Sequence, residues 1–254
     1  MVDVNFDGFD GRKEQLSKIL RFIDTEKQRF TPMFYRTNLL LHSERLYFLM
    51  RDLANIIINS YDGIVDLEKA LTLALVHDDA EIVTGDVQLY HKDRMTAEQL
   101  AEVQSNEERA IECLSKRWPY HINGFAYKDL LRHALRKDCL EAHIVSYLDK
   151  LDGFCESLHE IHAGNERFAG PATDYSKRLR LFTSKFPLLC RILPSHHPLL
   201  SSPRSFDADR VLAEGKLHSS ESVRRTTQFH FYDRWREITL EYFGEDALVG
   251  VRER

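Results

Sequence analysis

Cysteine is scarce in this sequence, and no two cysteines are close neighbours. The chain has four of them in 254 residues, at widely spaced positions with no Cys-x-x-Cys pair: Cys113, Cys139, Cys155 and Cys190. This spacing does not suggest a disulfide framework. We expect reduced, partly buried thiols of the kind that a cytoplasmic protein carries.

Long apolar runs and an excess of positive charge are also missing. No apolar stretch reaches the length of a membrane span, so no membrane partner is expected. Residues 1–5 are acidic and lack the basic and apolar regions of a signal peptide. A net charge of −5 argues against a surface that coats nucleic acid. The sequence therefore predicts a cytoplasmic protein without a nucleic-acid partner.

Helical periodicity dominates what the sequence does contain. Hydrophobic residues make up 43% and charged residues 30% of the chain, which is long enough for one domain with a substantial core. We find no convincing alternating strand and no internal repeat, so the expected fold class is all-α, a single helical domain. The expected caps are Asp66 and, in a capping box with Gln99, Thr96. The expected helices cover residues 11–26, 37–59, 66–85, 96–118, 130–136, 138–162, 173–186 and 221–243.

Ionisable side chains follow an apolar run in the middle of the chain. Residues 71–76 read Leu-Thr-Leu-Ala-Leu-Val, and His77, Asp78 and Glu81 come shortly after them. Isolated charges at the end of a buried helix are costly to desolvate, whereas a bound divalent cation would account for them together. On a straight helix, His77 and Asp78 point about 100° apart, near enough to share one ion. The alternative makes His77 a hydrogen-bonded core histidine, and makes Asp78 and Asp79 a solvated helix end.

Two more candidate ligands lie far away along the chain. His42 belongs to the preceding expected helix, and Asp149 stands among apolar neighbours in a later one. Two imidazoles and two carboxylates form a borderline nitrogen and oxygen site that suits Mn, Co, Fe, Zn or Mg. Taken alone, His42 would be a satisfied structural histidine. Asp149 competes with Asp152, which we expect to cap or to face solvent, and with Asp138 and Asp129.

The order of these residues resembles that of a known family. A histidine comes first, then His-Asp with Glu on the next turn, then Thr-Gly-Asp at 84–86, and last Asp149 followed by Lys150. In this respect the chain is similar to the HD-domain metal-dependent phosphohydrolases, and most to their bacterial 5'-deoxynucleotidase (YfbR-like) branch. The similarity covers roughly residues 11–165. It implies a helical HD-domain bundle at 1–165, with a C-terminal helical extension at 166–254 packed on it.

The resemblance also implies a metal site and two acid–base residues. One divalent ion would be held by four ligands, His42, His77, Asp78 and Asp149. Glu81 would position the attacking water and Asp86 would protonate the leaving group. The reverse assignment stays open, and so does a simple turn role for Asp86. A second metal is not expected, because no recognisable pairing joins the other histidines of the interval, His91, His121, His133 and His143.

Substrate contacts are implied for the segment before His42. In the resembled branch, an arginine followed by an aromatic residue holds the substrate phosphate and screens the sugar. The match in this sequence is Arg29-Phe30, with Phe where Trp is more usual. Arg36 is a second expected phosphate contact, because its guanidinium offers a planar fork of donors. The alternative for Arg29 and Phe30 is a surface arginine and a core phenylalanine. The alternative for Arg36 is an ordinary salt bridge.

The expected function is therefore that of a metal-dependent phosphohydrolase acting on a nucleotide. The resemblance implies hydrolysis of the phosphomonoester of (deoxy)nucleoside 5'-monophosphates by a metal-activated water. Another HD phosphohydrolase activity, such as a phosphodiesterase or a nucleotide pyrophosphohydrolase, is an alternative. A non-catalytic nucleotide-binding module is another. A homodimer is compatible with the resemblance, since related folds often pair through helices.

Overall fold

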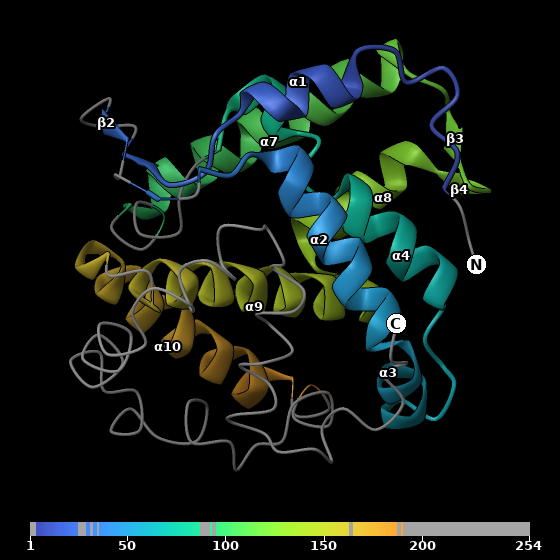
Figure 1. The fold of residues 1–254 in the computed structure, drawn as a ribbon. Helices are drawn as coiled ribbons and strands as arrows, with labels where there is room; N and C mark the ends of the chain where they lie inside the picture. The colour runs from blue at the N-terminus through green and yellow to red at the C-terminus, as the bar shows by residue number, and fades with distance from the viewer. Residues whose placement is uncertain are drawn as a thin grey trace. The chain divides into compact units, whose positions relative to one another are not determined.

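Helices dominate the computed structural model of this chain (Figure 1), so the expected all-α class is confirmed. The structure describes residues 4–24, 29–30, 33–34, 36–86, 92, 95–162, 165–186 and 189. None of the described helices has both the length and the apolar content needed to cross a membrane. The helix expected at 221–243 lies outside the described residues. In chain order the elements are α1 (Arg12–Lys18), β1 (Ile23–Asp24), β2 (Arg29–Phe30), α2 (Leu39–Asp52), α3 (Ala54–Ser60), α4 (Leu67–Val76), α5 (Glu81–Thr84), α7 (Ala97–Arg117), β3 (His121–Ile122), β4 (Phe125–Ala126), α8 (Tyr127–Arg136), α9 (Leu140–His162), the 3-10 helix η1 (Glu166–Phe168) and α10 (Ala169–Lys185).

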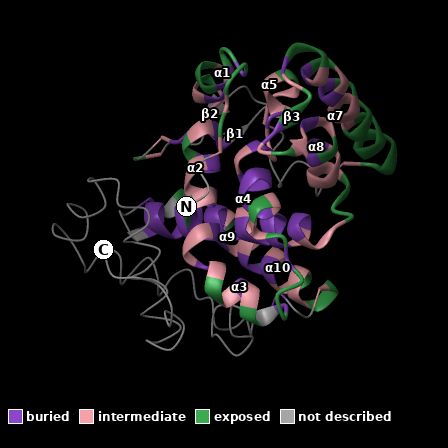
Figure 2. Ribbon diagram, turned by 90° about the vertical axis from the view of Figure 1, so that its right-hand side faces the viewer, coloured by how far each residue is buried: buried purple, intermediate pink, exposed green. Residues whose placement is uncertain are grey.

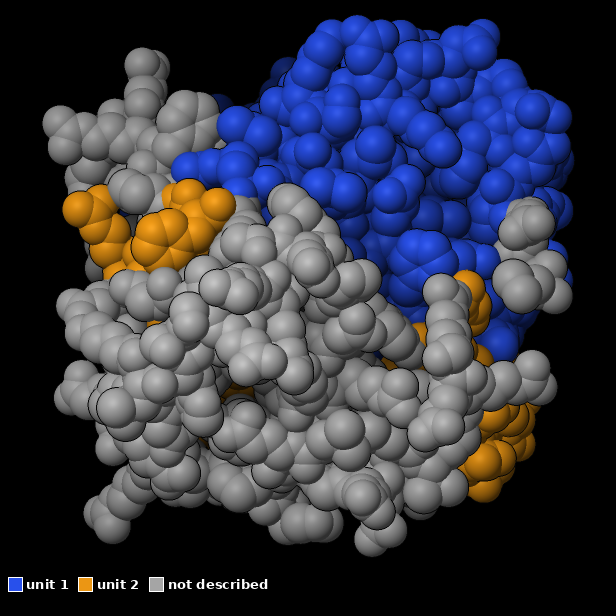
Figure 3. All heavy atoms as spheres, viewed as in Figure 1, with its two compact units in different colours: residues 1–31, 36–50, 66–146 blue, residues 32–35, 51–65, 147–254 orange. Residues whose placement is uncertain are grey.

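The chain divides into two compact units that are interleaved along the sequence (Figure 3). The first draws its described residues from Met1–Thr31, Arg36–Met50 and Asp66–Ser146. The second draws its described residues from Pro32–Tyr35, Arg51–Val65 and Tyr147–Arg254. The core at 1–165 and the extension at 166–254 stay predictions.

Two short hairpins were not expected from the sequence. In the first, β1 pairs antiparallel with β2, and in the second, β3 pairs antiparallel with β4. Each strand has two residues, too few for the alternating pattern by which a strand is recognised. The expectation of no strand is therefore wrong at these two places.

The first helix is shorter than expected because the chain beyond it pairs with a distant segment. α1 ends at Lys18. The amide of Arg21 donates to the carbonyl of Thr37 at 3.1 Å, and the amide of Leu39 donates to the carbonyl of Ile19 at 3.0 Å. These bonds tie the residues after α1 to the start of α2, and a continued helix would have used the same groups internally.

Helix α4 carries the apolar run of the first unit. Asp66 caps its N-terminus by accepting from the amide of Lys69 at 3.0 Å, as predicted. Buried residues lie along most of its length (Figure 2), consistent with the apolar run at 71–76. α8 packs against both α4 and α7, and α7 also packs against α5. α4 therefore presents its C-terminal end from a largely buried helix.

Two further sequence predictions concern helix boundaries. The capping box of Thr96 and Gln99 at the start of α7 is confirmed, since each side chain bonds the backbone of the other residue. The single helix expected at 37–59 is wrong in one respect. It is interrupted at Leu53, whose ψ of 0° departs from the helical value and separates α2 from α3.

In the second unit, α9 and α10 approach each other closely at Gly153. A Cβ atom built there would lie 2.6 Å from Cε1 and 2.8 Å from the hydroxyl oxygen of Tyr175. Glycine is therefore required at this contact, because any side chain would collide with the ring. Gly170, in α10, has nothing within 4 Å of the same position.

We predict opposite effects on stability for alanine at these two glycines. Gly153→Ala should lower the free energy of unfolding by about 1–2 kcal/mol, because overpacking outweighs the gain in helix propensity. Gly170→Ala should leave it unchanged or raise it by up to about 1 kcal/mol. Urea unfolding followed by circular dichroism measures both. Equal effects of the two changes would contradict the close contact.

Candidate metal centre

His77 stands at the C-terminal end of α4 with one ring nitrogen already engaged. Its Nδ1 lies 2.9 Å from the carbonyl oxygen of Ala74. A carbonyl can only accept, so Nδ1 donates its proton there, and Nε2 is the ring nitrogen left for a metal. Nε2 is buried and has no hydrogen-bond partner among the described residues. This is the arrangement of a histidine whose other nitrogen binds a metal.

His42 is brought to the same place by the start of α2. The side-chain oxygen of Asn38 accepts from the amide of Leu41 at 3.0 Å, which caps the helix. The amide of His42 donates to the carbonyl of Asn38 at 3.0 Å, so the imidazole lies in the first turn. The residue is fully buried, and its ring centroid lies 5.3 Å from that of His77.

Asp78 completes a group of three candidate ligands in the first unit. One of its carboxylate oxygens lies 3.4 Å from Nε2 of His42 and 3.2 Å from Nε2 of His77. One ligand atom from each residue lies within 4.8 Å of the others. Burial alone would raise the pKa of Asp78, but the imidazoles of His77 and His42 hold this pKa well below the usual range. The carboxylate is therefore ionised and suited to a cation.

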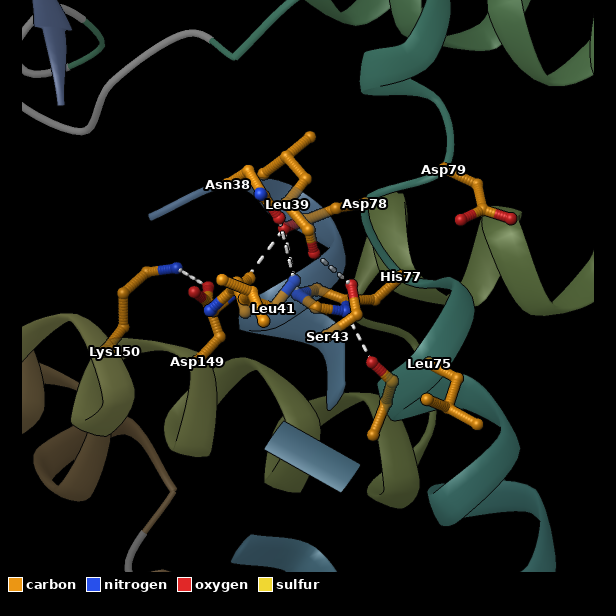
Figure 4. Close-up of polar contacts among 12 residues, drawn as sticks. Asn38, Leu39, Leu41, Ser43, Leu75, His77, Asp78, Asp79, Asp149 and Lys150 are labelled. Carbon is orange, nitrogen blue, oxygen red and sulfur yellow. Dashed lines mark hydrogen bonds and ion pairs between the residues drawn. The ribbon is translucent and has the colours of Figure 1, made fainter. Parts of the chain in front are cut away.

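The backbone at 77–80 differs from the straight helix that the sequence suggested. α4 ends at Val76, and residues 77–80 form a turn in which the amide of Asp79 donates to Val76 and that of Glu81 donates to Asp78. The carboxylates of Asp78 and Asp79 lie on opposite sides of this turn (Figure 4). Asp79 is fully buried, so the alternative of a solvated helix end is wrong.

The two predicted acid–base residues lie within electrostatic reach of this group. Burial and the carboxylate of Asp78 raise the pKa of Glu81 well above its usual range. Burial also raises the pKa of Asp86, against the opposing charge of Arg21. Oε2 of Glu81 is buried and has no hydrogen-bond partner among the residues that the structure describes. Both carboxyl groups therefore bind a proton more readily than an exposed carboxyl group does.

Arg21 is a site residue that the sequence reasoning missed. It is 6% exposed, and its charge lowers the pKa of both Glu81 and Asp86. Arg36 donates to its carbonyl at 3.0 Å, and the Arg21 guanidinium lies 5.8 Å from the ring centroid of Phe22. An Arg-Phe pair thus occurs at 21–22 as well as at 29–30. The Arg-Phe dipeptide expected from the sequence therefore occurs twice, and the prediction took the second occurrence.

The roles of the remaining predicted residues stay predictions. Arg29 and Phe30 belong to β2 by their backbone, and their side chains lie outside the described residues. Asp149 lies on α9 in the second unit and forms an ion pair with Lys150 (Figure 4). Its role as the fourth ligand stays a prediction. Asp152, expected at a cap or in solvent, is fully buried, so that expectation is wrong.

Another group of ligand types occurs in the first unit where α8 meets α9. It contains His133, Asp138 and Cys139 and is more exposed. Nδ1 of His133 lies 2.5 Å from a carboxylate oxygen of Asp138, so these two side chains already satisfy each other. We therefore assign no metal to it and keep to one ion.

The sequence of the chain is similar to that of bacterial enzymes. A family model described as 5'-deoxynucleotidase YfbR-like matches residues 19–186. A 5'-deoxynucleotidase of Vibrio vulnificus is 25% identical over 131 residues, which are 50% of this chain and 64% of that protein. One from Photobacterium profundum is 27% identical over 147 residues, 56% of this chain and 72% of that protein. The chain thus spans just under two thirds of the Vibrio relative's length.

The fold is similar to two solved structures. A conserved hypothetical protein from Pyrococcus furiosus superposes with a TM-score of 0.53 at 19% identity, covering 71% of this chain and 93% of that one. An HD-domain phosphohydrolase from Listeria innocua gives a TM-score of 0.54 at 17% identity, covering 83% and 97%. At these identities the likeness concerns the fold alone, and it agrees with the helical bundle expected from the sequence.

We predict that the three convergent side chains are required for metal binding. His42→Ala, His77→Ala and Asp78→Asn should each reduce bound divalent metal from about one equivalent to less than about a tenth, because each removes one ligand. Elemental analysis of the dialysed protein measures this. His121→Ala, at an exposed histidine, is the matched control. Unchanged metal content in the three ligand variants would contradict the site.

Proposed function

The chain belongs to the 5'-deoxynucleotidase YfbR-like family, and from this premise we propose that it is a metal-dependent phosphohydrolase. The proposed reaction is hydrolysis of the phosphomonoester of nucleoside 5'-monophosphates, with deoxynucleotides preferred. The names of the Vibrio and Photobacterium relatives support this substrate class. The observation that carries the proposal is the group of His42, His77 and Asp78, whose ligand atoms lie within 4.8 Å of one another.

The residues present fit a divalent cation. His77 offers a buried ring nitrogen, and Asp78 offers an ionised carboxylate. We propose His42 and Asp149 as the other ligands, a set that suits Mn, Co, Fe, Zn or Mg. A bound cation of this kind makes a water molecule more acidic and neutralises phosphoryl charge.

The carboxyl groups supply the proton transfers. In the proposed reaction, a water oxygen forms a bond to phosphorus while the bond to the 5' oxygen breaks. Glu81 accepts the proton of the attacking water, because it follows Asp78 by one turn and its buried oxygen is available. Asp86, whose pKa is raised, donates a proton to the departing 5' oxygen. The products are a nucleoside and inorganic phosphate.

Cationic side chains support binding of the substrate phosphate. Arg21 is buried, and its charge and that of Lys92 both reach Glu81. A guanidinium matches phosphate oxygens with two parallel donors. We propose Arg21 as the principal phosphate contact. The arginines predicted from the sequence, Arg29 and Arg36, are proposed as further contacts.

The aromatic neighbour of the phosphate contact supports discrimination of the sugar. Phe22 is 7% exposed and directly follows Arg21. A ring packed against the 2' carbon of the sugar would disfavour a ribose hydroxyl, because the hydroxyl would be desolvated without a partner. Phe30 was the residue indicated by the sequence, so two phenylalanines compete for this role.

We predict that Glu81 is needed for turnover but not for metal binding. Glu81→Ala should lower the rate of phosphate release from deoxynucleoside 5'-monophosphates by about 10²–10⁴-fold at unchanged metal content. Val83→Ala, at an exposed residue of the same short helix, is the matched control. Full activity of Glu81→Ala would remove Glu81 from proton transfer. If the wild-type protein hydrolysed cyclic nucleotides or nucleoside diphosphates but not monophosphates, the phosphodiesterase or pyrophosphohydrolase alternative would be supported.

We predict that Phe22 sets the preference for deoxynucleotides. Phe22→Ala should lower the ratio of kcat/KM for deoxy- over ribonucleoside 5'-monophosphates by about 10-fold, because a ring that rejects a hydroxyl by sterics and desolvation contributes on this scale. Phe30→Ala serves as the comparison and should leave the ratio unchanged. The opposite pattern would assign the role to Phe30, and no change in either variant would exclude both rings.

A further inference from the structure

We propose that Arg12 and Tyr127 are positioning residues for the metal ligands, acting through Asp79. They hold the carboxylate of Asp79 and thereby fix the turn at 77–80 that carries two of the ligands. This inference rests on the proposed function, since it concerns the same metal. The side-chain hydrogen bonds of both residues go to Asp79 and Leu75 among the described residues, and neither residue was suggested by any sequence pattern.

The contacts around Asp79 form a closed, buried cluster. The Arg12 guanidinium donates from Nε to Oδ2 of Asp79 at 2.7 Å and from a terminal nitrogen to Oδ1 at 2.6 Å. The hydroxyl of Tyr127 donates to Oδ2 at 2.8 Å. Arg12 is 2% exposed, and both Asp79 and Tyr127 are fully buried. Two parallel bonds and a third donor leave this carboxylate a single orientation.

Arg12 also contacts the chain on the other side of the ligands. The same terminal nitrogen donates to the carbonyl of Leu75 at 2.5 Å. This carbonyl belongs to the last turn of α4, where helix carbonyls lack intrahelical partners. Leu75 and Asp79 flank His77 and Asp78 in the sequence, so one side chain clamps both ends of the segment that presents them.

The partners of Asp79 are themselves held in place by aromatic packing. The Tyr127 ring centroid lies 5.1 Å from that of Phe9 and 6.1 Å from that of Trp118. The Arg12 guanidinium lies 4.3 Å from the centroid of Phe6. The position of the turn therefore depends on the N-terminal segment and on α8, although neither element supplies a ligand.

A gain in stability does not by itself explain the buried ion pair of Arg12 and Asp79. Burying an ion pair requires desolvation that the attraction often fails to exceed, and well-packed apolar residues of similar volume are often equally or more stabilising. An apolar residue at 79, however, would leave the turn held by its backbone hydrogen bonds without the side-chain contacts. Asp78 is joined to residue 79 by one planar peptide, so any rotation would move its carboxylate away from the two imidazoles.

The test is binding of Co²⁺ to the metal-free protein, followed by its visible absorption spectrum. Asp79→Asn should weaken Co²⁺ binding at least about 10-fold and change the absorption bands, because supporting residues set ligand geometry. Tyr127→Phe should have a smaller effect in the same direction. Glu141→Gln is the matched control. It weakens the other end of α4, where Glu141 accepts from the amide of Asp66 at 3.1 Å and pairs with Lys69 at 3.4 Å.

A fully apolar variant separates positioning from stability. In Arg12→Met/Asp79→Leu/Tyr127→Phe, the polar side-chain groups of the cluster are removed together, and the part-buried carbonyl of Leu75 is the one partner that loses its donor. We expect this variant to unfold at a temperature near that of the wild type and still to bind Co²⁺ weakly. Wild-type affinity and spectrum in this variant, or in both single variants, would overturn the inference while the proposed function stands. Failure of the wild-type protein itself to bind Co²⁺ would overturn both.

Discussion

Asp78 places one carboxylate oxygen 3.4 Å from Nε2 of His42 and 3.2 Å from Nε2 of His77. This three-way contact constrains the rest of the first unit, because it requires two helices to present their ends to the same point. The Asn38 cap fixes the start of α2. At the end of the buried α4, Nδ1 of His77 is already bonded to the carbonyl of Ala74. Such preorganisation is what allows a metal to bind without reordering the protein.

The electrostatics of the neighbouring groups follow from the same crowding. The carboxylate of Asp78 is kept ionised by the imidazoles, and its negative charge together with burial raises the pKa of Glu81. Arg21 opposes this effect at Glu81 and at Asp86. Carboxyl groups whose environments push their pKa values apart are suited to different roles in one reaction. The proposed division between metal ligand and proton carrier therefore has a physical cause.

Local signals in the sequence were reliable where the interaction itself is local. The caps at Asp66 and Thr96 are confirmed, since each involves residues three apart. The turn after Val76 and the burial of Asp152 were not foreseen. A two-residue strand leaves no periodic pattern, and a charged residue shows no sign of its burial when its neighbours alone are known.

The sequence by itself determined the helical class and predicted the candidate ligands, because an apolar run followed by His-Asp predicts a buried polar end. Tertiary structure decided which residues surround that end. Arg12 reaches Asp79 across 67 positions, and the pairing of residues 19–21 with 37–39 selects Arg21 as the buried cation near Glu81. Contacts between distant segments depend on how the chain packs as a whole, and no periodicity or short motif encodes them.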